Sequence, residues 1–424
     1  MRARPSLLYA QSGGMTAVIN ASAAGVLHAA QQHDIRVLAA VNGVLGMLEE
    51  ELLDVSRVSK RHIELLRQTP GGAFGSSRFP LGTPESKPAH YRRLIDVMAA
   101  HEVRWLLHNG GGGSAGTSLH IANAARAARY PLSVIHIPKT VDNDMALTDF
   151  SPGFGSVAKF TAVSVREAAQ DLAAMARTST KVFVMEVMGR HSGWIAASAA
   201  LAQSRDCPAP QIILFPEVKF DRTRFLQQVE AVVQRDGYCV VVVAEGALLE
   251  EGKTAMNSDS EHGRDLWHVQ AGHAAPQVAT LIKNELGLPC HFSISDYLQR
   301  SARHLASSVD SEAAWRVGTE AVALTLRGED RVMAALKRKT APTQSKARWT
   351  VEPVALTRVA GKEKNLPRHF IQRDGFSVSS SGLRWLQALI TGEDYPEFSG
   401  GLPLHAPALG KPLARKLPLY NSGS

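Results

Sequence analysis

The chain has 424 residues, of which 45% are hydrophobic and 20% are charged, and its formal net charge is +8. This length exceeds the size at which one hydrophobic core usually stops growing, so two lobes are expected. The basic residues are scattered and form no stripe interleaved with aromatic residues. This pattern argues against a nucleic acid partner and favours a cationic surface that attracts small anionic ligands.

The opening segment and the cysteines are typical of a cytoplasmic protein. The first apolar run, residues 7–10, is too short for a signal sequence or a membrane span, so no membrane association is expected. The cysteines Cys207, Cys239 and Cys290 are widely spaced and odd in number, which fits neither a disulfide framework nor a zinc site. We therefore expect buried thiols.

Apolar runs of strand length alternate with helix-like stretches along most of the chain. The expected strands are residues 6–10, 35–41, 103–109, 132–138, 181–187, 211–216 and 239–245, with helices at 16–33 and 117–128. Continuous apolar strands separated by helices are typical of a parallel sheet that is covered on both faces. The predicted fold class is α/β. Residues 250–262 are polar and predict a surface loop.

Polar or glycine-rich segments follow five of the expected strands. In chain order these segments are QSGG, NGGGGS, KTVDND, MGRHSG and EG. Ligands of parallel α/β sheets bind beyond the carboxyl ends of the strands, so these segments are where chemistry is expected. Gly13 and Gly14 lie between a strand and a helix, where a phosphate can approach backbone N–H groups.

The run Gly110 to Gly113 is a more extreme case of the same pattern. Consecutive glycines cost conformational entropy and are tolerated where a ligand such as a phosphate must approach the backbone. Gly111, Gly113 and Gly116 also match the G-x-G-x-x-G fingerprint of an NAD-dependent dehydrogenase. The next strand is followed by Lys139 rather than by a ribose-binding acid, which weakens the dehydrogenase interpretation but leaves it open.

The segment PKTVDND, residues 138–144, combines two carboxylates, an amide and a lysine in a short stretch. Phosphoryl transfer needs a group that accepts the hydroxyl proton, a divalent metal at the donor oxygens, and cations around the moving group. Asp142, Asp144 and Lys139 can supply these three needs. The segment therefore predicts phosphoryl-transfer chemistry more specifically than a turn rich in Asp and Asn does.

Seven motifs together resemble those of the phosphofructokinase family. They are, in order, QSGGMTAVIN, GGAFGSSRF, GGGGS, PKTVDND, PGFGSVAKF, MEVMGRHSGW and YLQR. They look most like the pyrophosphate-dependent bacterial branch, and the resemblance runs from about Leu7 to Ala323. It implies two similar Rossmann-like lobes with parallel-rich sheets. We expect a donor-binding lobe at 1–150, a fructose 6-phosphate lobe at 151–337, with crossings between them allowed, and a C-terminal extension at 338–424.

The resemblance also implies roles for individual residues. Asp142 resembles the general base that takes the proton of the sugar 1-hydroxyl, Asp144 resembles a carboxylate associated with Mg²⁺, and Lys139 resembles the lysine that steadies the moving phosphoryl group. The implied donor contacts are Gly13, Gly14, Arg78, Gly111, Gly112 and Ser114, and Gly113 belongs with Asp142 and Lys139 to the implied catalytic set. The implied sugar-phosphate contacts are Thr140, Val141, Asp142, Lys181, Met188, Gly189, Arg190, Glu245, Tyr297, Leu298, Gln299 and Arg300, with Lys181 contributed from a neighbouring subunit.

The chain departs from the family pattern at Gly112 and Gly113. The family commonly carries a metal-associated acid at the first position and, at the second, Asp in pyrophosphate users or Gly in ATP users. Glycine at 113 leaves open the space that the α-phosphate of a nucleotide would fill, which favours ATP. Lys139 and the other motifs favour pyrophosphate. Loss of the acid also permits a weakly active or regulatory sugar-phosphate binder.

The resemblance implies a reversible, magnesium-dependent transfer of phosphoryl from pyrophosphate to the 1-hydroxyl of fructose 6-phosphate, in glycolysis and gluconeogenesis. We expect a homodimer or a homotetramer. Transfer from ATP, a regulatory sugar-phosphate binder and an NAD-dependent dehydrogenase stay as alternatives.

Overall fold

The computed structural model describes residues 5–247, 274–339 and 349–422. The surface loop predicted at 250–262 lies outside these residues. The chain divides into two compact units. Unit 1 comprises Met1–Ser156, Arg303–Glu363 and Gly392–Ser424, and unit 2 comprises Val157–Ala302 and Lys364–Thr391.

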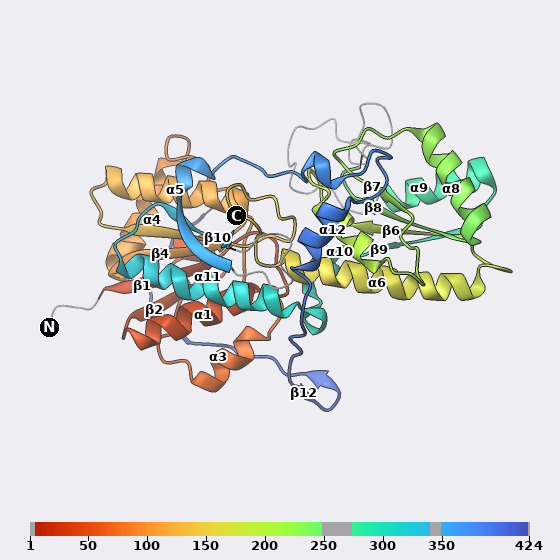
Figure 1. Cartoon of the computed structure of the whole chain (residues 1–424). Helices are drawn as coiled ribbons and strands as arrows, with labels where there is room; N and C mark the ends of the chain where they lie inside the picture. Colours follow the sequence, from red (N-terminus) through yellow and green to blue (C-terminus); the bar gives the residue numbers. More distant parts are fainter. Residues whose placement is uncertain (1–4, 248–273, 340–348, 423–424) are drawn as a thin grey trace. The chain divides into compact units, whose positions relative to one another are not determined.

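Unit 1 is built on an eight-stranded sheet with helices on both faces (Figure 1). In spatial order its strands are β11 (Trp349–Ala355), β10 (Val332–Arg338), β5 (Ser133–Pro138), β4 (Val103–Gly110), β1 (Ser6–Gln11), β2 (Arg36–Ala40), β3 (Leu52–Asp54) and β14 (Lys411–Pro412). The five strands from β10 to β2 are parallel, and antiparallel strands close both edges. The continuous apolar runs predicted this parallel centre, because strands covered on both faces need apolar side chains throughout.

Figure 1 shows α4 (Pro88–Ala100) and α5 (Gly112–Ala127) on one side of this sheet, and α1 (Ile19–Gln32) and α11 (Ser308–Leu326) on the other. Leu8, Leu38 and Leu106 of the sheet share a buried core with apolar residues of α4 and α5. The remaining elements of unit 1 include α2 (Val44–Glu49), α3 (Lys60–Arg67), β12 (Phe398–Ser399) and β13 (Leu402–Pro403).

The packing of α11 against α1 depends on two glycines. A Cβ atom on Gly25 would lie 2.3 Å from the carbonyl oxygen of Trp315, and one on Gly318 would lie 2.2 Å from that of Ser22. Both distances are shorter than van der Waals contact permits, so only glycine allows the two helix backbones to approach this closely.

The division of the chain differs from the predicted boundaries after Ala302. Residues 303–337 were expected in the second lobe, but α11 packs on α1 and β10 pairs with β5, so this segment belongs to unit 1. The expected extension at 338–424 is not a separate body either. β11 pairs with β10, residues 364–391 join unit 2, and β14 pairs with β3.

A buried carboxylate fixes the end of the chain on unit 1. Glu50 accepts a hydrogen bond from His101 Nε2 at 2.7 Å and from the backbone N–H groups of Lys416 at 2.6 Å and Leu417 at 3.1 Å. Burial alone would raise the pKa of Glu50, but these hydrogen bonds outweigh it and hold the pKa below its ordinary value. The final segment is therefore an integral part of unit 1.

Unit 2 contains a smaller, fully parallel sheet. Its strands in spatial order are β7 (Ile212–Leu214), β8 (Cys239–Ala244), β6 (Val182–Val187) and β9 (Cys290–Ile294). Figure 1 shows α8 (Arg222–Asp236) and α9 (Ala274–Leu286) on one side of the sheet and the long helix α6 (Phe154–Met175) on the other. Its other helices include α7 (Trp194–Ser198), α10 (Asp296–Ser301) and α12 (Ser380–Gln387). Unit 2 is therefore α/β as predicted.

Two properties expected from composition can be compared with the structure. Cys207 and Cys239 are buried and Cys290 is partly exposed, and all three are free thiols. No helix within the described residues has both the length and the apolar character needed to cross a membrane.

Gly318→Ala is expected to lower the free energy of unfolding by about 1–3 kcal/mol, because the added methyl group forces α11 away from α1. Chemical unfolding monitored by circular dichroism measures this change. Gly116→Ala is the matched control, since a Cβ there meets no atom within 4 Å. The control should be neutral or stabilising, by up to about 1 kcal/mol. Equal stability of Gly318→Ala and the wild type would contradict the close-packing argument.

Candidate functional site

The carboxyl ends of β1, β4 and β5 lie next to one another in unit 1. Gln11 at the end of β1 pairs with Asn109 of β4, and Gly110 pairs with Pro138 at the end of β5. The chain order reverses at β1, with β2 on one side and β4 on the other, which is the position where α/β sheets bind ligands. The segments that follow these three strands are therefore the candidate donor site.

Lys139 links two of these segments. Its side chain is buried, and its Nζ donates a hydrogen bond to the carbonyl oxygen of Gly14. Gly13 adopts a left-handed backbone, with φ of +77°, and a Cβ there would lie 3.5 Å from Lys139 Nζ and 4.0 Å from Ser114 Oγ. Four of the predicted donor-side residues thus meet at one point.

The glycine run forms the start of α5, with Gly111 as its N-cap. The sequence predicted a helix only from Thr117, because glycine disfavours helix formation, so this prediction was wrong at its N-terminal end. The first backbone N–H groups of a helix have no acceptor within the helix and can bind an anion. A Cβ on Gly112 or Gly113 would meet no atom within 4 Å, so the space around them is open.

The segment that contains Arg78 lies beside the first glycine loop. Ser77 pairs with Ser12, and Ser76 Oγ donates to the carbonyl oxygen of Gly13 at 2.8 Å. Arg78 itself is exposed. Two buried amides hold the preceding turn: Asn20 Oδ1 accepts the N–H of Ala73 at 3.0 Å, and Gln11 Oε1 accepts the N–H of Phe74 at 3.4 Å. Sequence reasoning missed Gln11 and Asn20, because their partners are distant in the chain.

The loop after β5 presents its two carboxylates on alternate residues. Val141 and Asn143 are buried, whereas Asp142 and Asp144 are half-buried. The N–H of Asp142 donates to Thr140 Oγ1 at 3.1 Å. Asn143 has a left-handed backbone, with φ of +52°, and its Oδ1 accepts the N–H of Ser151 at 3.1 Å. Local hydrogen bonds therefore fix the loop that carries both acids.

The described residues contain no group of three or more His, Cys, Asp and Glu side chains arranged to hold a metal ion. Magnesium in phosphoryl-transfer enzymes is usually bound by one or two carboxylates together with phosphate oxygens and water. Asp142 and Asp144 fit that partial set, whereas Gly112 has no side chain to offer.

The predicted sugar-phosphate residues of unit 2 meet at the carboxyl ends of β6 and β8. The N–H of Met188 donates to Gln299 Oε1 at 3.1 Å, and the N–H of Gly189 donates to Glu245 Oε1 at 3.2 Å. Arg190 Nε lies 3.7 Å from the same Glu245 oxygen. Gly189 has φ of +127°, a backbone conformation that favours glycine.

Burial dominates the electrostatics of Glu245. It raises the pKa of this carboxyl, although the Arg190 charge and the Gly189 N–H both act to lower it. The nearby carboxylates Glu186 and Asp296 add to the rise. Glu245 is therefore a carboxylate that costs folding free energy when it is ionised, which is a common property of binding sites.

The remaining residues of this group are placed differently. Tyr297 and Leu298 are exposed, and the Arg300 guanidinium lies 3.9 Å from the centre of the Tyr297 ring. Lys181 precedes β6, at the opposite end from Met188, and its Nζ donates to the carbonyl oxygen of Ala176. The structure therefore does not bring Lys181 together with the other predicted residues of unit 2.

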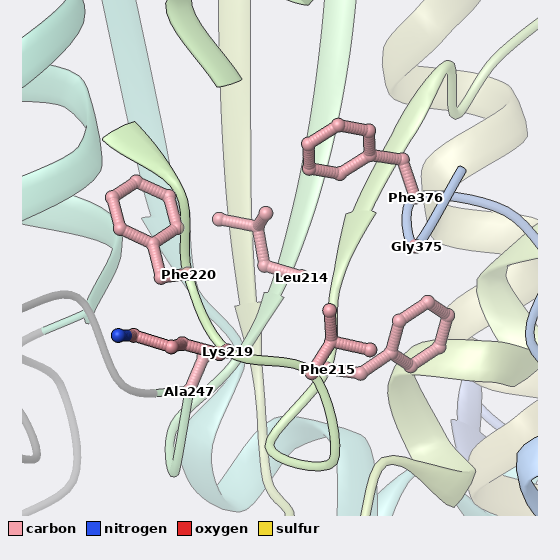
Figure 2. A pocket seen from close by; sticks show the side chains of 8 residues that line it. Leu214, Phe215, Lys219, Phe220, Ala247, Gly375 and Phe376 are labelled. Atoms are coloured by element: carbon pink, nitrogen blue, oxygen red, sulfur yellow. The ribbon is translucent and has the colours of Figure 1, made fainter. Parts of the chain in front are cut away.

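A small, largely apolar pocket in unit 2 contains none of the predicted residues. It is lined by Leu214, Phe215, Val218, Lys219, Phe220, Ala247, Gly375 and Phe376. Figure 2 shows the Lys219 side chain extending away from Phe215 and Phe376. The pocket offers no polar groups directed at a common point, so we do not assign it to the candidate site.

Comparison with known proteins supports the motif analysis. A family model described as Phosphofructokinase matches residues 6–325. A pyrophosphate–fructose 6-phosphate 1-phosphotransferase of Halomonas elongata is 49% identical, over 99% of this chain and 99% of that protein. One of the same name from Xanthomonas campestris is 49% identical, over 98% and 99%. The crystal structure of a pyrophosphate-dependent phosphofructokinase from Nitrosospira multiformis aligns with a TM-score of 0.90 at 44% identity, over 99% of this chain and 100% of that chain. This chain belongs to the phosphofructokinase family.

Proposed function

We propose that this chain transfers a phosphoryl group from pyrophosphate to the 1-hydroxyl of fructose 6-phosphate, reversibly, giving fructose 1,6-bisphosphate and orthophosphate. The observation that carries the proposal is the contact of Lys139 with Gly14 beside the open N-terminus of α5. The Lys139 ammonium lies beside the first backbone N–H groups of α5, which have no acceptor within the helix. Together they are suited to bind the oxygens of a phosphoryl donor. Relatives matched over nearly the whole chain carry names that specify this donor and this acceptor.

Asp142 is proposed as the general base. Its carboxylate takes the proton of the sugar 1-hydroxyl while that oxygen forms a bond to phosphorus and the bond to the leaving phosphate breaks. Lys139 balances the negative charge that accumulates on the leaving oxygens. The loop hydrogen bonds at Thr140 and Asn143 keep the base in place, which preserves its alignment for transfer.

Phosphotransferases of this family need a divalent metal ion, and we propose Mg²⁺ here. Asp144 would hold it together with phosphate oxygens and water. When bound, the ion supplies neutralising charge at the donor oxygens. Gly112 has no side chain that could bind the ion, and the space beside it is open. Water and donor oxygens can therefore occupy that space and complete the ligands of the ion.

In unit 2, Arg190 and Arg300 are proposed to bind the phosphate of the sugar, because a guanidinium can meet two phosphate oxygens at once. Glu245 is proposed to accept a hydrogen bond from a sugar hydroxyl. Its carboxylate already fixes the Gly189 N–H and lies near Arg190, so one buried acid orients the turn that presents this arginine.

A homodimer or a homotetramer in the cytoplasm stays part of the proposal. The support for an oligomer is Lys181. This residue lies at the opposite end of β6 from the other predicted sugar-phosphate residues of unit 2. To complete a site on a second copy, the Lys181 ammonium would share or give up its hydrogen bond to the Ala176 carbonyl oxygen.

ATP is the alternative donor, and Gly113 is the observation that favours it. A Cβ at this position meets no atom within 4 Å, so the space that an α-phosphate would need is open. The test is the initial rate of fructose 1,6-bisphosphate formation with Mg²⁺ and either pyrophosphate or ATP at equal concentration. Activity with pyrophosphate alone supports the proposal, and activity with ATP alone overturns the donor. No activity with either donor, combined with fructose 6-phosphate binding, would favour a regulatory binder.

Asp142→Asn is expected to lower kcat by about 10² to 10⁴, because it removes the proton acceptor while keeping the size of the side chain. Steady-state assays at saturating substrates measure this change. Asp149→Asn is the matched control, since Asp149 follows in the same loop and bonds the N–H of Arg338. It should retain normal turnover. Near-normal kcat for Asp142→Asn would remove Asp142 from the mechanism.

Gly113→Asp is expected to lower kcat/KM for ATP by about 10- to 100-fold, through repulsion between the carboxylate and the α-phosphate. Folding should be unaffected because the site is open. Gly113→Asn has the same bulk without the charge and separates the two effects. A donor preference that both variants leave unchanged would show that this position does not select the donor.

Glu245→Gln is expected to stabilise the protein at neutral pH. Because burial raises the folded-state pKa above the ordinary value of 4.5, stability falls as pH rises through that range, and the amide avoids this loss. We expect a gain of about 0.5–2 kcal/mol at neutral pH, shrinking at acid pH, and a KM for fructose 6-phosphate raised by about tenfold. Urea unfolding and steady-state kinetics measure both. Glu230→Gln, exposed on α8, should change neither. A Glu245→Gln variant less stable than the wild type at neutral pH would contradict the predicted sign of the change in the free energy of unfolding.

A further inference from the structure

Two buried histidines lie beneath the glycine run, and neither has a role in the proposed reaction. His108 of β4 and His136 of β5 stand opposite each other in the sheet, are fully buried, and direct their rings at one another with centroids 6.0 Å apart. Ser118 of α5 lies between them. Its Oγ is 2.9 Å from His108 Nδ1 and 3.1 Å from His136 Nδ1.

The partners of these groups assign their protons. His136 Nε2 lies 3.0 Å from the carbonyl oxygen of Gly110, which can only accept, so Nε2 carries the proton and Nδ1 is an acceptor. The Ser118 hydroxyl proton is then shared between two acceptors, the carbonyl oxygen of Ser114 at 2.9 Å and His136 Nδ1 at 3.1 Å. His108 Nδ1 then donates to Ser118 Oγ. The hydrogen bonds from His108 to Ser118, from Ser118 to His136 and from His136 to Gly110 therefore all run in the same direction.

The Gly110 carbonyl oxygen is a shared acceptor. It receives the N–H of Lys139 at 3.0 Å as well as Nε2–H of His136. A Cβ on Gly110 would lie 2.4 Å from Ser114 Oγ, so only glycine fits where α5 approaches the strand. A glycine has no side chain to limit rotation of its peptide groups, and its orientation therefore depends on its hydrogen bonds.

We propose that His136 is a positioning residue for the donor side of the reaction, an inference that rests on the proposed function. Its Nε2–H fixes the Gly110 carbonyl oxygen towards β5. The N–H of Gly111 belongs to the same planar peptide group and must point the opposite way. His136 thereby sets the direction of the Gly111 N–H and holds it in register with the backbone of Lys139. Ser118 and His108 keep His136 in the required tautomer.

The electrostatic environment agrees with this arrangement. Burial lowers the pKa of His108 to about 4, and the charge of Lys139 lowers it further. Burial, His108 and Lys139 also hold the pKa of His136 well below its ordinary value, against the opposing effect of the Gly110 hydrogen bond. Both rings are neutral at physiological pH, so the series of hydrogen bonds from His108 to Gly110 keeps one direction. Lys139 is a charged group that acts on both rings.

The kinetic test compares two substitutions of the same residue. His136→Leu removes the donor at similar size, whereas His136→Gln keeps a side-chain N–H that can reach the carbonyl oxygen. We expect His136→Leu to lower kcat/KM for pyrophosphate by about 10- to 100-fold and to leave the KM for fructose 6-phosphate unchanged. His136→Gln should recover most of the loss. Thr325→Val, which removes a buried hydroxyl that bonds Ala321 O at 2.9 Å, is the control and should behave as wild type.

A second measurement does not depend on turnover. Calorimetry of magnesium pyrophosphate binding without sugar should show weaker binding to His136→Leu by a similar factor, with recovery in His136→Gln. Wild-type protein that binds magnesium pyrophosphate but forms no product would overturn the proposed function and leave this comparison intact. Equal binding by wild type and His136→Leu, or a Gln variant as poor as Leu, would overturn the inference.

The assigned protons can be observed directly. Nitrogen-15 spectra of histidine-labelled protein at about pH 6 should show His136 neutral with its proton on Nε2, and His108 neutral with its proton on Nδ1. Ser118→Ala should weaken, without removing, the preference of His136 for a proton on Nε2, because the Gly110 carbonyl oxygen still needs a donor. Thr325→Val should leave this preference unchanged. A charged His136 ring, or the opposite tautomer in wild type, would break the hydrogen-bond chain and overturn the inference even if the enzyme is active.

Discussion

Hydrogen bonding between β4 and β5 is the constraint on which the donor site depends. Because Gly110 lies opposite Pro138 in this parallel pair, the glycine run and Lys139 leave the sheet side by side. The N–H of Lys139 continues the ladder by bonding Gly110 O, so the lysine starts its path fixed to the glycine run. Its ammonium then reaches Gly14 at the end of β1. One strand register thus brings together three loops that are far apart in sequence.

Positive charge at the junction of Lys139 and the glycine run comes from two sources. Lys139 supplies a buried positive charge, and the N-terminus of α5 adds the partial positive charge of its helix dipole. The two histidines beneath them stay neutral, which avoids a second buried cation that would repel the first and cost folding free energy. The positive potential is therefore concentrated on the side of the loop where an anionic donor is proposed to bind.

Apolar runs predicted β1, β4, β5, β6 and β8 closely, because a strand buried on both faces carries the signal in every residue. The return of α11 to unit 1 was not predictable in this way, since it depends on Gly25 and Gly318 meeting across a long stretch of chain. His108 and His136 were missed for the same reason. Each lies inside a strand that the apolar pattern predicted, and their shared role exists only once the β4–β5 register is known.

In the proposed reaction, glycine at positions 112 and 113 leaves donor recognition to the backbone and Lys139. Pyrophosphate offers only charged oxygens, so its binding free energy must come from cations, metal and N–H groups gathered at one place. ATP has an adenosine that adds binding energy through contacts elsewhere. The open space beside Gly113 removes a barrier to ATP but adds no attraction for it. Lys139 and the N-terminus of α5 are proposed to attract the phosphates directly, and for this reason pyrophosphate, and not ATP, is the proposed donor.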